Sequence, residues 1–320
     1  MASKPIVSIV VECGTRTISE RIPFRKMAAA YLTEARESFS DSQFEIFFIG
    51  SGLPSKSPAK NCRFIDMRET GYYGWKNAGA KIARGRYVVY WDSDCRLGKG
   101  YLKRAIEVLE KDPKAAGVAG RTRYDGKSFI CRLNTALSFG YFSRIGKNIT
   151  PPFTAVANNV VIRKSLHPTP PFGPFDGRVG GDLYLTTAAM KSGHTLRFDP
   201  ELKVFHEDPA SSPASFQERH LRDLFNTFLK FPLKSKTGAL MSCFLTVLIL
   251  PLWRVKTLFK FGGGSDLNLA ERLLGLLVIL VYAFLDTLLA LKAALVPGLL
   301  GKRLKFQFGD KWLNDQGIRC

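Results

Sequence analysis

Two carboxylates, Asp92 and Asp94, follow directly on a run of β-branched and aromatic residues, 87–91. The run predicts a buried strand, and an isolated buried carboxylate is unfavourable by several kcal/mol unless a cation or a donor compensates it. Mg²⁺ and Mn²⁺ prefer hard oxygen ligands and are commonly held by one or two carboxylates plus substrate phosphates. The pair therefore predicts a divalent cation, Mg or Mn, that carries a phosphorylated ligand. An acidic turn after a strand is the alternative for such a pair taken alone.

Strands and helices are predicted to alternate around this pair. Strands are expected at 6–12 and 44–50, and residues 71–86 are typical of a glycine-rich loop, a short helix and a Gly-Arg turn leading into the strand at 87–91. The alternation predicts an α/β fold with a mostly parallel sheet flanked by helices. Ligands of such a sheet bind outside the carboxyl ends of its strands.

With these elements in order, the chain resembles the family-2 glycosyltransferases of the GT-A fold, the fold of nucleotide-diphospho-sugar transferases. Family members share the opening strand, a helix with the pattern Arg/Lys-Asn-x-Gly, here residues 76–79, and a strand ending in Asp-x-Asp. The resemblance covers roughly residues 5–225. Its second half lies in the segments 157–164, 172–176, 180–185, 191–194 and 204–206.

The resemblance implies a role for each part of the site. It implies that Asp92 and Asp94 hold the metal and the donor diphosphate, with Asp94 as the direct ligand, and that His206 completes the metal site. It also implies that Asp182, at a helix start, is the catalytic base. The donor contacts it implies are Lys76, Asn77 and Asp92, and the acceptor contacts are Asn158, Asn159 and Asp176. Glu12, where the chain departs from the usual turn of the family, is expected as a further donor contact.

The chemistry can be argued independently of the resemblance. Moving a sugar from a nucleoside diphosphate with inversion needs a base that takes the acceptor proton, and positive charge on the departing diphosphate. Asp182 suits the first role, because Gly180 and Gly181 before it leave room for a substrate. The alternatives are an ordinary helix N-cap for Asp182, a structural histidine at His206 and a charged loop residue at Glu12.

The chain departs from the family pattern at several positions. The second strand runs into Gly50-Ser51-Gly52, where family members usually carry an Asp pair that binds the nucleoside base. Gly181 stands before the expected base in place of an acid, and Lys76 stands where Arg is usual. Lysine meets phosphate as a point charge. The identities of the sugar and the nucleoside therefore stay open.

The net charge of +20 is spread along the chain and no nucleic-acid motif accompanies it, so no nucleic-acid partner is predicted. Anionic lipid headgroups and phosphorylated substrates explain the charge equally well. The six cysteines lack Cys-x-x-Cys spacing, so neither a zinc site nor a disulfide framework is predicted. No signal peptide is expected before the first strand.

The last third of the chain is much more apolar. Residues 238–253 carry no charge, and residues 273–291 carry only Asp286. Basic residues on both sides of the first run favour a hairpin that lies in one leaflet over a single crossing. At about 1.5 Å per residue the second run extends roughly 28 Å, which leaves spanning as an alternative. Two buried core helices of a soluble protein are the other alternative.

The predicted organisation is a GT-A catalytic domain at 1–215, a basic connector at 216–237, a membrane-associated helical hairpin at 238–300 and a basic tail at 301–320. The predicted function is that of a bacterial-type polysaccharide or glycolipid glycosyltransferase. It moves a sugar from a nucleotide-sugar donor, with inversion, to a lipid-linked or polysaccharide acceptor at the cytoplasmic membrane face. The alternatives are a metal-dependent nucleotidyltransferase and a non-catalytic membrane-bound GT-A-like scaffold.

Overall fold

The computed structural model describes residues 5–13, 24–67, 71–150, 153–167, 169–175, 180–207, 236–261 and 266–295. The chain divides into two compact units. The first comprises residues 1–123 and 145–206, and the second comprises residues 124–144 and 207–320.

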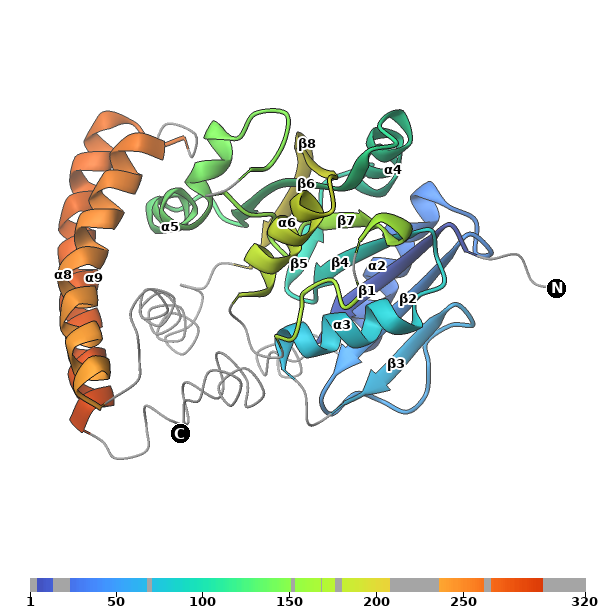
Figure 1. The fold of residues 1–320 in the computed structure, drawn as a ribbon, viewed down its shortest axis with the longest axis horizontal. Coiled ribbons are helices and arrows are strands. Elements are labelled where there is room, and N and C mark those ends of the chain that lie inside the picture. Colours follow the sequence, from blue (N-terminus) through green and yellow to red (C-terminus); the bar gives the residue numbers. More distant parts are fainter. Residues whose placement is uncertain are drawn as a thin grey trace. The chain divides into compact units, whose positions relative to one another are not determined.

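The first unit contains a sheet whose order, in the described part of the chain, is β3-β2-β1-β4-β7-β6-β8-β5 (Figure 1). β1 pairs in parallel with β2 and β4, and β2 pairs in parallel with β3. β7 is antiparallel to both β4 and β6, and β5 is antiparallel to β8. The strands are β1 (Val7–Glu12), β2 (Phe44–Gly50), β3 (Cys62–Asp66), β4 (Tyr87–Asp92), β5 (Cys95–Leu97), β6 (Ala115–Tyr124), β7 (Val160–Arg163) and β8 (Thr195–His206).

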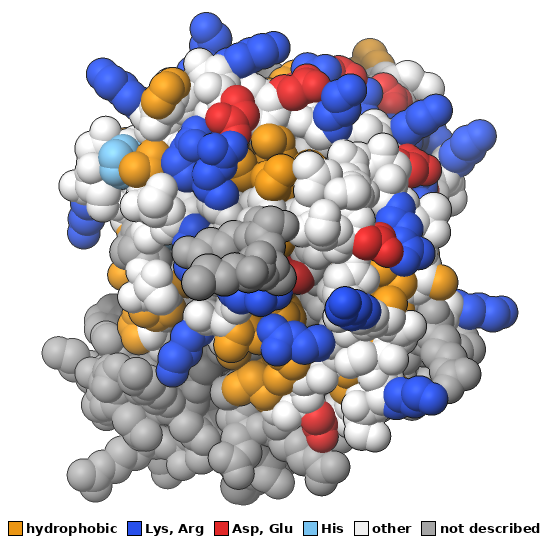
Figure 2. Space-filling model, turned by 90° about the vertical axis from the view of Figure 1, so that its right-hand side faces the viewer, with side chains coloured by type: hydrophobic (Ala, Val, Ile, Leu, Met, Phe, Trp, Pro, Cys, Tyr) orange, Lys and Arg blue, Asp and Glu red, His pale blue; other side chains and the backbone are white. Residues whose placement is uncertain are grey.

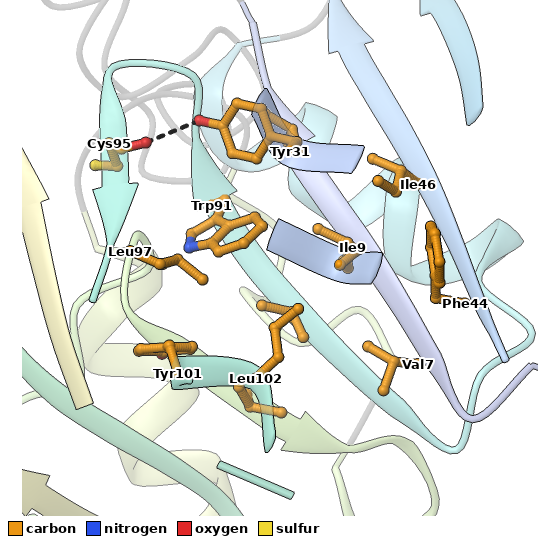
Figure 3. Packing of buried hydrophobic residues seen from close by; sticks show 14 of the residues in the cluster. Val7, Ile9, Tyr31, Phe44, Ile46, Trp91, Cys95, Leu97, Tyr101 and Leu102 are labelled. Carbon is orange, nitrogen blue, oxygen red and sulfur yellow. Dashed lines mark hydrogen bonds between the residues drawn. The ribbon is translucent and has the colours of Figure 1, made fainter. Parts of the chain in front are cut away.

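Helices cover both faces of the parallel strands, which explains why β1, β2 and β4 are buried along their whole length. Alternate residues of β1 and β4, such as Ile9 and Trp91, pack in one cluster with Tyr31 of α2 and Leu102 of α4 (Figure 3). The helices of this unit are α2 (Phe24–Ser38), α3 (Tyr72–Ile82), α4 (Tyr101–Lys111), the short η2 (Lys164–Leu166) and α6 (Gly181–Lys191).

Helix α3 lies directly on the opposite face of the sheet. A Cβ atom added at Gly79 would stand 2.4 Å from Cγ1 of Val10 in β1, so only glycine permits this approach. Successive side chains of β4 point to opposite faces of the sheet. Because Trp91 packs in the cluster on the α2 and α4 side, the Asp92 side chain points to the α3 side. The glycine of the Lys-Asn-x-Gly pattern therefore brings Lys76 of α3 close to Asp92.

The second unit consists of α5 (Phe129–Phe139), η1 (Gly140–Arg144), α8 (Lys236–Phe261) and α9 (Leu269–Leu295) among the described residues. Helices α8 and α9 lie side by side (Figure 1). Leu133 of α5 packs in one apolar cluster with Leu258 of α8 and Ile279 of α9. Helix α5, which was predicted to belong to a domain at 1–215, thus packs apolar side chains against the C-terminal helices.

The two expected apolar runs form long helices. Helix α8 includes residues 238–253, with Pro251 inside it, and continues to Phe261. Helix α9 includes residues 273–291. No helix in the described ranges combines the length and the apolar run that crossing a bilayer requires. Most of the expected connector, 216–235, and the whole expected tail, 301–320, lie outside the described residues.

Basic side chains are dispersed over the surface. The face drawn in Figure 2 carries Lys and Arg side chains in many places, with Asp and Glu between them. This distribution agrees with a positive charge that is spread along the chain.

Candidate active site

A buried ion pair joins α3 to the end of β4. The ammonium Nζ of Lys76 lies 2.5 Å from Oδ1 of Asp92, and the Lys76 side chain is fully buried. The same Nζ donates to the carbonyl oxygens of Trp91, at 3.2 Å, and Ala157, at 3.1 Å. These three contacts match the three donors of an ammonium group. Lys76 therefore ties together α3, the end of β4 and the segment before β7.

The Asp92 carboxylate is also held from the first turn of α3. The hydroxyl of Tyr72 lies 3.0 Å from Oδ1 and 2.9 Å from Oδ2 of Asp92. The main chain at this point is fixed from the other face, where the Tyr31 hydroxyl lies 2.8 Å from the carbonyl oxygen of Asp92 and 3.0 Å from that of Cys95. Figure 3 shows the contact with Cys95. A buried carboxylate held by an ammonium and a phenol is compensated without a metal.

Four side chains that can bind a metal converge where β4 ends. One ligand atom each from Asp92, Asp94, Cys95 and His206 lie within 4.8 Å of one another. His206 is the last residue of β8, and its Nε2 lies 3.5 Å from Oδ1 of Asp94. Two carboxylates and an imidazole are a donor set that accepts divalent cations such as Mn²⁺. The three metal ligands expected from the sequence thus lie together, with Cys95 as an addition.

Asp182 lies in the first turn of α6 and does not cap it. The N-cap is Gly180, which makes no side-chain hydrogen bond to the helix. Instead, Oδ1 of Asp182 accepts a hydrogen bond of 3.0 Å from the Ala157 backbone N–H, and Tyr73 also bonds to the carboxylate. The carboxylate is therefore directed at the segment before β7 rather than at its own helix.

Burial raises the pKa of Asp182 to about 6. Nearby Asp92 also raises it, whereas the bonds from Tyr73 and Ala157 and the charge of Lys76 lower it. Burial also raises the pKa of the Cys95 thiol, with the charges of Asp94 and Asp92 adding to the effect. At neutral pH Asp182 is thus mostly ionised and Cys95 is neutral in the metal-free protein.

The two glycines before Asp182 do not leave room for a substrate, and that part of the prediction is wrong. A Cβ atom at Gly181 would lie 2.6 Å from the ring of Tyr73, and one at Gly180 would lie 2.5 Å from the ring of Phe175. Gly180 also has a φ of 94°, which favours glycine. Two aromatic rings therefore occupy this space, which explains why Gly181 replaces the acid usual in the family.

Asn77 anchors a loop instead of lining an open pocket. Its amide nitrogen donates to the carbonyls of Gly173 and Phe175, and its oxygen accepts from the Phe172 N–H. The ring of Phe172 packs against Tyr90 of β4. Asn77 thus fixes the loop that leads towards Asp176, and Asp176 itself lies outside the described residues.

The other expected contacts are buried. Glu12 is 1% exposed and pairs in register with Asp92 across β1 and β4. Asn159 is fully buried and bonds to Tyr101, Thr122 and the Leu202 carbonyl, so its amide links the segment before β7 to α4, β6 and β8. Asn158 is also buried, and its oxygen accepts from Thr122. In this arrangement the amide groups of Asn159 are not available to an acceptor.

The sequence analysis assigned no role to Tyr72, Tyr73 or Cys95, although each contacts an expected site residue. The signal for the tyrosines is their place at the start of the α3 helix, three and four positions before Lys76. The signal for Cys95 is its place next to Asp94.

Comparisons with known proteins agree with this architecture. Residues 24–167 match the model of the family described as Glycosyl transferase family 2. This segment belongs to family 2 of the glycosyltransferases. The family-2 match covers α2 to β7 and includes both Lys76 and the Asp92–Asp94 pair. It supports sugar transfer as the activity.

The mannosyltransferase PcManGT from Pyrobaculum calidifontis, solved in complex with GDP-Man and Mn²⁺, has a similar structure. The TM-score is 0.52 at 15% identity, and the match covers 89% of this chain and 88% of that chain. The likeness confirms the GT-A fold predicted from the sequence. No curated protein matches the chain.

The Lys76–Asp92 pair gives a stability prediction. We expect Lys76→Met to lower the free energy of unfolding by about 3–5 kcal/mol, because it leaves a buried carboxylate without its cation. The matched control is Arg36→Met, which breaks the Arg36–Asp41 pair whose side chains are 51% and 59% exposed. That variant should lose much less stability, because water screens an exposed ion pair. Urea unfolding measures both, and equal losses would contradict the structural role of Lys76.

Proposed function

We propose that this glycosyltransferase moves a sugar from a nucleotide-sugar donor, with inversion, to a lipid-linked or polysaccharide acceptor. One observation carries the proposal. The first unit holds a cluster of cation ligands and, joined to it through Lys76 and Ala157, a separate carboxylate whose pKa is about 6. A cluster of cation ligands together with a separate carboxylate of raised pKa suits transfer from a diphosphate.

Asp94, His206 and Asp92 would hold the cation. A bound Mg²⁺ or Mn²⁺ supplies a Lewis acid that neutralises charge on the departing diphosphate. The fold neighbour PcManGT, with GDP-Man and Mn²⁺, supports a nucleotide sugar and a divalent cation as the ligands. The ammonium of Lys76 pairs with the Asp92 carboxylate in its buried position.

Asp182 would act as the general base. With a pKa of about 6 it is largely ionised at neutral pH and still close to the working pH, which is where a base is most effective. Ala157 and Tyr73 orient the carboxylate. It would take the proton of the acceptor hydroxyl as that oxygen attacks the sugar from the face opposite the diphosphate, which inverts the configuration.

Donor binding is tested by thermal unfolding of the full chain with a panel of nucleotide sugars. We expect one donor to raise the melting temperature only when Mn²⁺ or Mg²⁺ is present, because ligand at 100 times its Kd stabilises the protein by about 2.7 kcal/mol. Asp94→Ala should abolish this shift. Asp112→Ala, a carboxylate at the end of α4 that pairs with Arg197, is the control and should retain it. A panel without any metal-dependent shift would count against the proposal.

The base is tested with Asp182→Asn. We expect sugar transfer to fall by about 10²–10⁴-fold because proton acceptance is lost, while donor binding persists. In the wild type the rate should fall about tenfold per pH unit well below pH 6, as Asp182 becomes protonated. The control Asp112→Asn should keep both rate and profile. Near-normal turnover of Asp182→Asn would show that another group is the base.

The raised pKa of Asp182 also predicts a pH dependence of stability. The folded state binds this proton more tightly than the unfolded state, so its contribution to stability is lost as pH rises from 3.8, the ordinary pKa of an aspartate, through about 6. Asp182→Asn should remove that component from urea-unfolding profiles measured across this window. An unchanged profile would mean that burial does not shift the pKa of Asp182.

We further propose that α8 and α9 attach the enzyme to the cytoplasmic face of a membrane. Large apolar side chains recur on both helices at intervals of three or four residues and are exposed, which supports an interfacial position. Trp253 is 54% exposed with Nζ of Lys256 6.0 Å from its ring, a pair suited to the headgroup region. The exposed residues are Leu248, Ile249, Leu252, Trp253, Phe259, Leu269, Leu273, Leu274, Leu277, Leu280, Val281, Phe284, Leu288 and Leu291.

Attachment is tested with vesicles of phosphatidylcholine and phosphatidylserine. Leu252→Glu combined with Leu277→Glu should weaken flotation of the full chain by at least about tenfold, because burying one Leu side chain contributes about 1.5–3 kcal/mol. Met190→Glu, at an exposed position on α6, is the control and should float like the wild type. Equal flotation of all three proteins would exclude these faces as the contact.

A further inference from the structure

Cys95 and His206 are cross-strand partners. Cys95 opens β5 and pairs in antiparallel register with His206 at the end of β8. Directly opposite residues of an antiparallel pair project from the same face of the sheet. The Cys95 thiol and the His206 imidazole therefore stand side by side, although the sequence separates them widely.

Both side chains meet the same carboxylate oxygen. Sγ of Cys95 lies 3.7 Å from Oδ1 of Asp94, and Nε2 of His206 lies 3.5 Å from that atom. In a four-coordinate zinc site, bonds of about 2.0–2.3 Å place neighbouring ligand atoms roughly 3.3–3.8 Å apart. These two distances already fit such a site, and Asp92 supplies a fourth ligand, with all four ligand atoms within 4.8 Å of one another.

The sulfur changes which cations this cluster prefers. Thiolate and imidazole bind Zn²⁺ and Cd²⁺ well, whereas Mg²⁺ and Mn²⁺ prefer oxygen. Cys95 is 8% exposed, and its sulfur lies beside the carboxylates of Asp92 and Asp94, which attract a cation to it. We infer that Asp92, Asp94, Cys95 and His206 form a second binding mode for a thiophilic divalent cation, held through the Cys95 sulfur. The thiol releases its proton to water as the metal–sulfur bond forms.

The two modes should exclude each other. A cation held by four protein ligands has a closed coordination sphere, whereas a catalytic ion must keep positions open for substrate. Zn²⁺ in the four-ligand mode would leave no position for diphosphate oxygens. Zinc would then inhibit transfer by competing with Mn²⁺, a consequence that rests on the proposed function, whereas the binding itself does not.

The binding is tested by titrating the full chain with Cd²⁺ and recording the ultraviolet sulfur-to-cadmium charge-transfer band. The wild type should show a band that saturates at one equivalent. Cys95→Ser should lose this band and bind Cd²⁺ at least about tenfold more weakly, with a smaller change in its Mn²⁺ affinity. Cys62→Ala, a buried cysteine of β3 outside the cluster, is the control and should behave like the wild type.

A measurement on the wild type alone guards against misfolding of the variant. Excess Mn²⁺ with a nucleoside diphosphate should displace the one-equivalent band, because both modes use Asp94. A band that persists in Cys95→Ser, or that Mn²⁺ and nucleotide do not displace, would overturn the inference. Mn²⁺-dependent transfer that Zn²⁺ does not inhibit would also overturn it while leaving the proposed function intact. Cadmium binding through Cys95 in a protein without transferase activity would contradict only the proposed function.

Discussion

The buried Lys76–Asp92 ion pair is the interaction on which the site depends. Two charges removed from water are unfavourable unless their geometry is good and their remaining hydrogen-bonding groups are satisfied. Here the ammonium has three acceptors for its three protons, namely Asp92, the Trp91 carbonyl and the Ala157 carbonyl. This match gives a physical reason for lysine where family members usually carry arginine. The five donors of a guanidinium would exceed the acceptors within reach.

Ala157 extends this interaction to the proposed base. Its carbonyl accepts from Lys76, and its N–H donates to Asp182, so one residue of the main chain links the ion pair to the carboxylate. Lys76 and Asp92 also shift the pKa of Asp182 in opposite directions. A change of charge at Asp92, as on cation binding, would therefore change the pKa of Asp182. Tyr72 and Tyr73, neighbours in α3, hold one carboxylate each and fix the spacing between the two centres.

The sequence predicted those features that follow from local patterns. Apolar runs gave the parallel strands, and their polar ends placed Asp92 at the carboxyl edge of the sheet and Asp182 at a helix start. Features that depend on tertiary contacts were not predictable in the same way. Whether Asn77 and Asn159 point into a pocket or satisfy buried backbone groups is decided by partners distant in the sequence. The pairing of Cys95 with His206 is likewise a matter of strand register, which the cysteine spacing does not reveal.

The second unit also contains a buried ion pair, and its surroundings bear on the membrane proposal. Arg254 of α8 bonds to Asp286 of α9, with Tyr282 packed against the guanidinium and bonded to Asn134 of α5. Asp286 is 1% exposed, whereas Leu252 and Leu280 on the outer faces are 71% and 64% exposed. A helix pair of a soluble core would turn its apolar residues inward and its charges to water. Here the charges are neutralised between the helices and leucines lie outward, an arrangement that costs little only where the outer faces meet an apolar medium. The same physical constraint, a charge buried only with its partner, thus shapes the candidate active site in one unit and is consistent with the proposed lipid-facing role of the other.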